Sequence, residues 1–316
     1  MTSAPTRIAE PGAGIGSAGP LRRLGRRMVE GRTVPILTVV AAILAIWYLA
    51  AIGMNWQTET DKLVRAGEAY GIVDTIAATW SAERPILPAP HQIVAEIWKS
   101  TVLVKPTSPR SLLFHAWVTL SSTLLGFVIG TALGVALAVG ILHSRTLDRS
   151  LMPWIITSQT IPILAIAPMI IVVLNAVGVQ GLLPKAIIST YLSFFPVAVG
   201  MVKGLRSPDA MLLDLMHTYS ASRPQILAKL RWPASMPFLF TSMKVAVAAA
   251  LVGAIVGELP TGAVAGLGAR LLAGSYYGQT IQIWSALVAA AVMAGILVWL
   301  VGLGERISLK RMGERS

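Results

Sequence analysis

Cysteine is absent from the sequence and charged residues are scarce, and each of these features excludes a class of protein. Without cysteine there can be no disulfide framework, no thiolate metal site and no cysteine nucleophile. Only 13% of the 316 residues are charged, whereas a soluble domain carries about 25%. So small a share cannot cover a globule in water, and 55% of the residues are hydrophobic. Much of the surface must therefore face lipid.

Motifs that carry chemistry are absent as well. The sequence has no GxxxxGK[ST] loop to cradle phosphates, so it has no capacity of its own to hydrolyse ATP. Its four histidines lie in different segments without ligand spacing, and no serine–histidine–acid arrangement can be assembled. The apolar stretches carry almost no ionisable side chain that could bind a coupling ion. We therefore expect a protein that is not an enzyme, and any uphill transport must draw its energy from a partner.

Six apolar stretches are long enough to cross a membrane, because a bilayer core about 30 Å thick needs roughly 20 apolar residues in a helix. The first stretch follows an arginine-rich arm and is longer than the apolar region of a signal peptide, so we interpret it as a retained helix. The expected fold class is an all-α membrane protein with about six transmembrane helices. The stretches are Val34–Gly53, Trp117–Leu142, Met152–Leu174, Leu183–Lys203, Met236–Val256 and Trp284–Leu303.

The positions of lysine and arginine predict the orientation. If the N-terminus lies in the cytoplasm, 18 of the 26 basic residues fall on the cytoplasmic side. The positive-inside bias therefore predicts that both termini are cytoplasmic. Basic residues near helix ends meet anionic membrane lipid, which accounts for the net charge of +12 without a nucleic-acid partner.

Composition divides the chain into segments. The N-terminal arm is rich in Gly, Pro, Ala and Ser and is expected to be disordered. Short external helices are expected near Thr60–Trp80 and His91–Val104. Gly126, Gly130 and Gly134 are spaced by four and predict a close-packing seam on the second span. The expected divisions are the arm at 1–33, the first transmembrane helix at 34–54, the external segment at 55–112, a core of five spans at 113–305 with a loop at 205–235, and a cytoplasmic tail at 306–316.

The loop between the fourth and fifth spans should form two short helices. Ser207 is a plausible N-cap for the first, which should run to about Tyr219. Ser222 can cap the second, which should end before Pro233. Such helices would expose polar and aromatic side chains to a cytoplasmic partner, although an ordinary amphipathic loop lying on the membrane would show the same pattern. The side chains expected to be exposed are Asp214, Met216, His217 and Tyr219.

This loop resembles the signature of permease subunits of bacterial ATP-binding-cassette (ABC) importers, which reads Glu-Ala-Ala, three residues, Gly, nine residues, then Ile-x-Leu-Pro. The spacing holds from Asp214 to Pro233: Asp214 takes the Glu position, Ser220 the Gly position, and Leu230, Trp232 and Pro233 the Ile, Leu and Pro positions. Leu215 and Met216 replace the two alanines with bulkier side chains, and Ser220 cannot take a positive φ angle as cheaply as glycine. Three further segments resemble the nitrate, sulfonate, taurine and pyrimidine-precursor branch of these permeases. They are Ile86–Trp98, Arg149–Gly178 and Ser193–Asp209.

The resemblance implies a type I importer permease in the bacterial inner membrane, with five spans in a core permease domain. It implies a second permease copy, favouring a homodimer although a paralogue stays open, and two ATPase subunits that bind ATP and Mg while this chain holds no cofactor or metal. A periplasmic or lipid-anchored binding protein would deliver the solute. The residues it assigns to ATPase coupling are Asp214, Leu215, Met216, His217, Thr218, Tyr219, Ser220, Ala221, Ser222 and Arg223. The candidates for the substrate path are Ser158, Gln159, Thr160, Tyr191, Ser193, Phe194 and Phe195.

Two other functions fit the apolar composition. An ATP-independent channel or secondary carrier would need its own gating charges or an ion site, and a membrane scaffold or signalling protein would leave the loop without an ATPase. The solute stays open among nitrate, alkylsulfonates, taurine and pyrimidine or flavin precursors. The external insertion at 55–84 is longer than is usual in this branch, and contact with a binding protein is one hypothesis for it.

Overall fold

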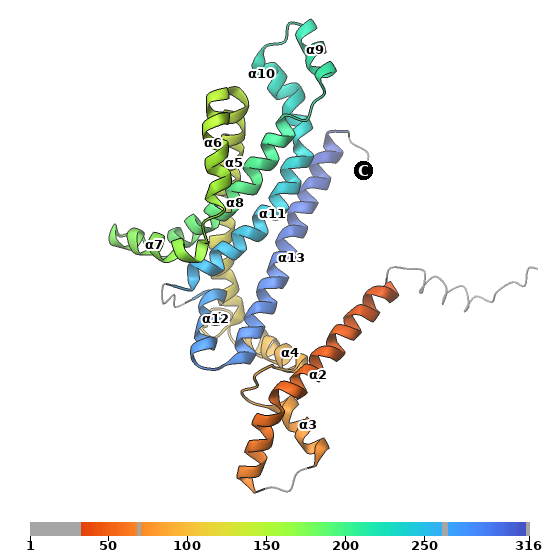
Figure 1. The fold of residues 1–316 in the computed structure, drawn as a ribbon, viewed down its shortest axis with the longest axis vertical. Coiled ribbons are helices and arrows are strands. Elements are labelled where there is room, and N and C mark those ends of the chain that lie inside the picture. Colours follow the sequence, from red (N-terminus) through yellow and green to blue (C-terminus); the bar gives the residue numbers. More distant parts are fainter. Residues whose placement is uncertain (1–32, 68–70, 261–264, 314–316) are drawn as a thin grey trace, which may run out of the picture.

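A computed structural model describes residues 33–67, 71–260 and 265–313, and the regular elements in these ranges are helices (Figure 1). The arm predicted to be disordered lies outside the described residues, except for its last position. The elements are α2 (Thr33–Ala66), α3 (Ile72–Ser81), α4 (Pro90–Trp98), the π-helical turn η1 (Lys99–Leu103), α5 (Leu112–His143), α6 (Arg145–Ser158), α7 (Ile163–Ala176), α8 (Leu182–Leu205), α9 (Ala210–Thr218), α10 (Arg223–Ile226), the π-helical turn η2 (Leu227–Arg231), α11 (Trp232–Glu258), α12 (Leu267–Tyr276) and α13 (Thr280–Arg311).

The core of the bundle is formed by α5, α8 and α11, with α8 in contact with both of the others. The glycine seam predicted on the second span is confirmed, and its partner is α8. A Cβ atom added at Gly126 would lie 2.7 Å from the carbonyl oxygen of Ala186, and one added at Gly134 would lie 2.8 Å from that of Phe194. Only glycine lets the two backbones approach this closely.

Among the described residues, five helices are long and apolar enough to cross a membrane, and there are six spans if the bent pair α6 and α7 is counted as one. The predicted stretches 117–142, 183–203, 236–256 and 284–303 lie inside α5, α8, α11 and α13. The last helix runs on to Arg311, so the expected boundary between the core and the tail falls within α13. The chain is therefore a multi-pass membrane protein.

The third predicted span, Met152–Leu174, is wrong as a single helix. Its residues form α6 and α7, which are bent by 100° relative to each other, so that α7 runs across the direction of α5 and α8 (Figure 1). Pro162 lies at the break, with Ile161 before it and α7 after it. Proline donates no backbone hydrogen bond and disfavours helical geometry in the residue before it, which ends α6 here.

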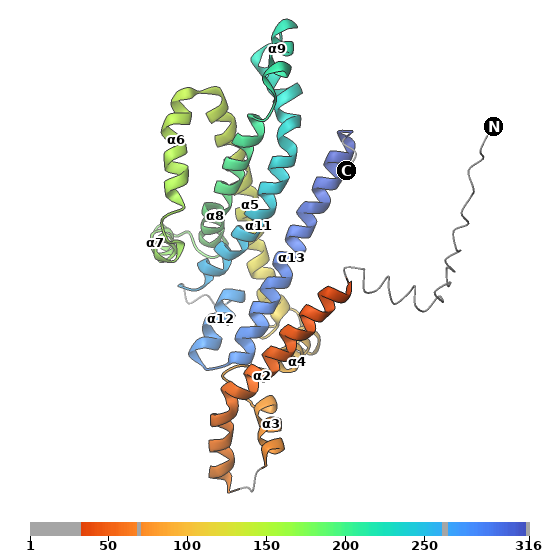
Figure 2. The same ribbon diagram turned by 45° about the vertical axis from the view of Figure 1, so that its right-hand side comes forward.

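The first helix is longer than predicted. α2 runs unbroken from Thr33 to Ala66, so the expected boundary at residue 54 lies inside a helix, and the expected helix Thr60–Trp80 is wrong. Its first residues belong to α2, Gly67 follows with a φ of +70°, and α3 begins at Ile72. Much of α2 stands apart from the bundle (Figure 2). Where it meets the rest of the chain, Trp47 packs on Trp284 of α13, with 4.9 Å between ring centroids.

Candidate functional site

The loop at 205–235, which we call the coupling loop after the role expected for it, projects from one end of the bundle, and the turn inside it has a defined geometry. α9 begins after Asp209, so the predicted cap at Ser207 is wrong, and it ends at Thr218. The N–H of Ser220 donates to the carbonyl of His217 at 2.8 Å, and that of Ala221 donates to Met216 at 2.9 Å. This pair of bonds is a Schellman motif, whose C′ residue normally takes a left-handed conformation and is usually glycine.

Ser220 occupies that C′ position with a φ of +53°, and it is the one non-glycine residue with a positive φ in the described part of the chain. The position that resembles the signature glycine is therefore the position at which this turn requires left-handed backbone. A serine Cβ makes this conformation more costly than it would be for glycine. The turn keeps its shape although the sequence departs from the signature.

The second half of the coupling loop leads directly into a membrane-spanning helix. Ser222 caps α10 as predicted, and its N–H donates to the Gln225 side chain at 2.8 Å. The prediction that this helix ends before Pro233 is wrong, because α10, η2 and α11 follow one another without a break from Arg223 to Glu258. The π-helical turn η2 directly precedes Trp232 and Pro233, so the departure from regular α-helical hydrogen bonding falls where Pro233 lacks a backbone N–H.

The two faces of α9 have different surroundings, although His217 is exposed as predicted. Met211, Leu215 and Tyr219 are spaced by four and form one face, with relative exposures of 76%, 50% and 78%. Leu213 and His217 lie on the opposite face and line a cavity between the loop and the bundle. Asp214, Thr218 and Ser222 are exposed, as is Arg223, whereas Met216 and Ala221 are half-buried. The expected exposure of Met216 is therefore wrong.

The predicted path residues do not all meet at one place. Ser158, Gln159 and Thr160 end α6 at the bend, and the Tyr191 hydroxyl of α8 donates to the Ser158 carbonyl. Ser193, in contrast, is fully buried in the seam between α8 and α5, where its hydroxyl lies 3.2 Å from the carbonyl of Gly126. Phe194 and Phe195 are half-buried and pack against the hydrophobic core of the bundle. The structure thus brings Tyr191 to the bend and separates Ser193 from it.

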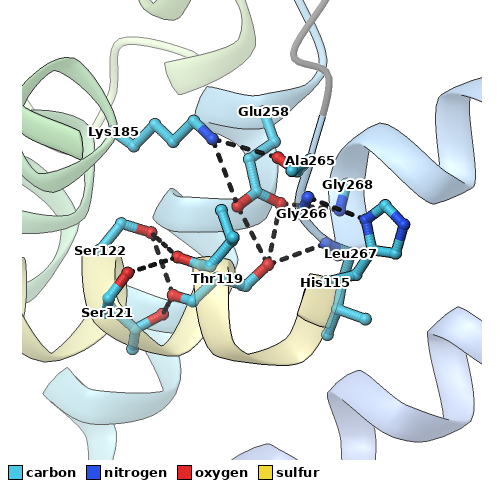
Figure 3. Close-up of polar contacts among 12 residues, drawn as sticks. His115, Thr119, Ser121, Ser122, Lys185, Glu258, Ala265, Gly266, Leu267 and Gly268 are labelled. Carbon is cyan, nitrogen blue, oxygen red and sulfur yellow. Dashed lines mark hydrogen bonds and ion pairs between the residues drawn. The ribbon is translucent and has the colours of Figure 1, made fainter. Parts of the chain in front are cut away.

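A cluster of polar residues centred on Glu258 lies at the end of the bundle that carries α12 (Figure 3). The Glu258 side chain is fully buried at the end of α11. Its carboxylate accepts a hydrogen bond from the Thr119 hydroxyl at 3.0 Å and another from the N–H of Gly268 at 2.8 Å. Lys185 supplies the positive charge, with its Nζ 3.8 Å from Oε1 of Glu258. We call Glu258, Thr119, Lys185, His115 and the backbone at 265–268 the Glu258 cluster.

The cluster fastens the start of α12 to α5. The N–H of Leu267 donates to the Thr119 hydroxyl at 2.8 Å, and the N–H of Gly266 donates to Nδ1 of His115 at 3.0 Å. The other ring nitrogen of His115 lies 2.9 Å from the carbonyl of Pro109, which fits a neutral ring with its proton on Nε2. Buried polar groups cost free energy unless they are paired, and here the contacts satisfy the carboxylate and the start of the helix together.

Gly266 is required by this geometry. Its φ is +127°, a conformation that side chains rarely adopt, and a Cβ atom there would overlap the carboxyl group of Glu258. Glycine at this position lets the backbone of the loop wrap around a buried carboxylate. The position therefore combines a conformational reason for glycine with a steric one.

A cavity of about 680 Å³ opens next to the Glu258 cluster, between α4, η1, α5 and α12. Arg270 of α12 is buried beside it, donating to Oε1 of Glu96 and to the carbonyl of Arg110, each at 3.0 Å. Burial lowers the pKa of Arg270 from its usual value, and the neighbouring Glu96 carboxylate opposes this shift. Within the ranges that the structure describes, no group of His, Asp or Glu side chains is arranged to hold a metal ion.

Sequence reasoning missed the Glu258 cluster. It found the four histidines in different segments without ligand spacing and assigned no role to Glu258. The contributing residues lie in three distant parts of the sequence, at 115–119, at 185 and at 258–268, so no local spacing joins them. The available signal was an acidic residue at the end of an apolar helix, followed after a short interval by two glycines, Gly266 and Gly268. A buried acid near paired glycines indicates close backbone approach, but it does not identify the partners.

Comparison with known proteins shows what this chain resembles. The family described as binding-protein-dependent transport system inner membrane component matches residues 130–313. The riboflavin transport system permease protein RibX of Chloroflexus aurantiacus is 32% identical over 71% of this chain and 80% of its own length. The formylaminopyrimidine transport permease protein ThiX of Halalkalibacterium halodurans is 30% identical over 62% and 74%. The putative aliphatic sulfonates transport permease protein SsuC of Bacillus subtilis is 26% identical over 78% and 84%.

Proposed function

This chain belongs to the family of binding-protein-dependent transport system inner membrane components and is an ABC transporter permease subunit. From that premise we propose which partner supplies the energy for transport and where on this chain that partner docks. A separate ATPase subunit binds ATP and Mg, docks on the coupling loop and drives import of a solute that an external binding protein delivers. Two permease copies form the path and two ATPase subunits lie beneath them. The comparisons give no support to an ATP-independent channel or carrier.

The observation that carries the proposal is the exposed apolar face of α9. Met211, Leu215 and Tyr219 project from the bundle on a helix in which no residue is buried. Apolar and aromatic side chains in such a position stabilise a protein interface, and buried anchors of this kind often dominate its affinity. The Schellman turn at Ser220 sets the direction in which the chain leaves α9 towards α10.

The continuity of α10, η2 and α11 supports a mechanical route for coupling. These elements form one helical rod from Arg223 to Glu258, about 54 Å long at 1.5 Å per residue. Displacement of the coupling loop would move the rod as a rigid body and carry Glu258 with it at the opposite end. Closure of the ATPase would thereby bias the position of the Glu258 cluster between two states of the permease.

With both termini cytoplasmic, the coupling loop faces the ATPase and α12 faces the binding protein. The bend at Ser158–Thr160 and the adjoining Tyr191 are our candidates for the solute path, because the broken backbone there leaves polar groups at the depth of a membrane helix. The solute belongs to the nitrate, sulfonate, taurine or pyrimidine and flavin precursor class. Riboflavin and formylaminopyrimidine are the first to test, since relatives at 32% and 30% identity are named for them.

The experiment reconstitutes the permease in vesicles with its cognate ATPase and binding protein and measures ATP-driven uptake. Truncating Tyr219 to Ala should lower affinity for the ATPase by about 2 kcal/mol, which is roughly thirtyfold, if the side chain is an interface anchor. The matched control is Tyr276→Ala in α12, because this tyrosine is 80% exposed at the opposite end. Equal copurification of the ATPase with both variants would reject the docking surface. Uphill uptake by the permease alone would reject the proposed function.

A further inference from the structure

A basic cavity of about 680 Å³ lies between the coupling loop and the bundle, at the end where α5 turns into α6. Four arginines line it, and Asp148 is the acidic residue among its lining side chains. Asp148 already forms an ion pair with one of the four, Arg206, at 2.9 Å. The remaining positive charge is therefore uncompensated by the residues that the structure describes. The arginines are Arg145, Arg206, Arg223 and Arg231.

The cavity lies behind the proposed ATPase surface. Leu213 and His217 line it from α9, whereas Leu215 and Tyr219 project from the opposite face of the same helix. An ATPase docked on the outward face would leave the cavity between the loop and the bundle. An occupant of the cavity would contact the coupling loop and the α5–α6 turn at once, so it would influence the position of the loop relative to the spans.

The lining is amphipathic as well as basic. Ile141 and Leu142 come from the last turn of α5, and Ile226 and Leu227 come from the junction of α10 with η2. Apolar side chains at the ends of membrane helices therefore lie beside guanidinium groups, which bind phosphate oxygens through planar pairs of donors. This combination matches a molecule with a phosphate group and an apolar continuation. Basic pockets between membrane helices on the cytoplasmic side are known to hold anionic lipid head groups.

We propose that this cavity binds a phosphate group, supplied by an anionic phospholipid of the cytoplasmic leaflet, and that the bound lipid holds the coupling loop in its working position. The inference rests on the proposed function for the orientation of the loop and for the activity it influences. It goes further by assigning a ligand class to residues outside the ATPase surface and the solute path.

Binding is tested by native mass spectrometry of the purified permease–ATPase complex titrated with phosphatidylglycerol or phosphatidylcholine. Phosphatidylglycerol should be retained in preference. Each basic charge near an anionic lipid contributes about 1 kcal/mol, so Arg145→Ala should weaken retention about fivefold and Arg145→Glu about 25-fold. Arg149 is the matched control, because it is exposed four residues away on α6 and does not line the cavity. Arg149→Ala should leave retention within about twofold. Equal effects of the two substitutions would overturn the proposal.

A second experiment distinguishes a phospholipid from free phosphate as the ligand. Inorganic phosphate is added at millimolar concentration to the complex in detergent. If it displaces no lipid, the lipid assignment stands. If it replaces the lipid with the same dependence on Arg145, a free anion is the ligand and the lipid assignment is overturned.

A third experiment distinguishes failure of this inference from failure of the proposed function. ATP-driven uptake is compared in vesicles with and without phosphatidylglycerol. Wild type should respond to the lipid and Arg145→Glu should not. Uptake that is absent in every lipid would reject the proposed function, whereas uptake that ignores lipid in both proteins would reject this inference alone.

Discussion

At the coupling-loop end, α9 has no buried residue, and its turn is held by backbone hydrogen bonds within a few residues of chain. At the α12 end, four helices from three distant parts of the sequence meet around one buried carboxylate. The first end has an exposed apolar face, whereas the second satisfies its polar groups internally. Local unfolding costs least where few buried contacts hold an element, so the coupling end should be the softer of the two.

The rod formed by α10, η2 and α11 joins these two ends. A soft surface at one end can adapt to a moving partner, and a stiff cluster at the other can exist in one of two discrete arrangements rather than deforming continuously. The contrast therefore suits a device that receives a force at one end and opens at the other. It also separates the expected mutational effects: changes at the α12 end should lower the stability of the fold, and changes at the coupling end should spare it.

The largest effect is expected from Glu258→Ala. The substitution leaves the Gly268 N–H, the Thr119 hydroxyl and the Lys185 ammonium without their shared acceptor. Removing one partner of a buried ion pair costs about 3–5 kcal/mol, so the melting temperature in detergent should fall sharply or the protein should fail to fold. Glu258→Gln keeps an acceptor oxygen and should lose less. If the two variants melt together with wild type, the cluster does not stabilise this end.

Gly266→Ala should come next. The new Cβ faces both a strained φ of +127° and the carboxyl group of Glu258, which together should cost about 2–4 kcal/mol. Gly278→Ala is the matched control, because Gly278 also has a positive φ, +64°, but no atom lies within 4 Å of its added Cβ. The difference between the two melting temperatures measures the contact with the carboxylate together with the greater strain of a φ of +127° over one of +64°. Equal losses would mean that neither adds to the cost of an ordinary left-handed conformation.

A carboxylate-to-amide change on each side compares the two ends directly. Glu96→Gln removes the charge that faces buried Arg270, at a cost of about 2 kcal/mol for a hydrogen bond to a charged group. Asp148→Asn removes the partner of Arg206 at the coupling end, where both side chains are at least one-third exposed, and should cost under about 1 kcal/mol. Thermal melting of the two variants measures the difference. A larger loss from Asp148→Asn would reverse the comparison.

The sequence was sufficient for features that depend on neighbouring residues. Runs of apolar residues located α5, α8, α11 and α13, and the spacing of Gly126, Gly130 and Gly134 predicted a packing seam, because both signals follow helical periodicity. The cap at Ser222 was also predicted from the local sequence, although the same reasoning wrongly placed a cap at Ser207. The partner of the seam was not, since a glycine stripe shows that a backbone can approach without showing which one does.

Features that depend on competition or on distant contacts were missed. The stretch at 152–174 was apolar enough to predict one span despite its polar residues at 157–160, and Pro162 outweighed that hydropathy by removing a backbone donor. α2 continued past residue 54 because nothing before Gly67 stops a helix, whereas the sequence analysis ended this helix near residue 54 and began a separate one at Thr60. The Glu258 cluster required knowing that α5, α8, α11 and α12 meet, which is a property of the tertiary fold alone.

Ser220→Gly should have the smallest effect of these substitutions, and it should make the coupling end more stable. Serine at the C′ position of the turn holds a φ of +53°, and glycine would adopt it without a Cβ penalty, so the loop should become more stable by up to about 1 kcal/mol. The gain should appear as slower amide hydrogen exchange in α9, while the melting temperature of the whole protein hardly moves, because α9 opens independently of the bundle. Ser220→Ala keeps the Cβ and should show no gain. Slower exchange in both variants would mean that the serine hydroxyl, rather than the backbone conformation, limits the stability of the turn.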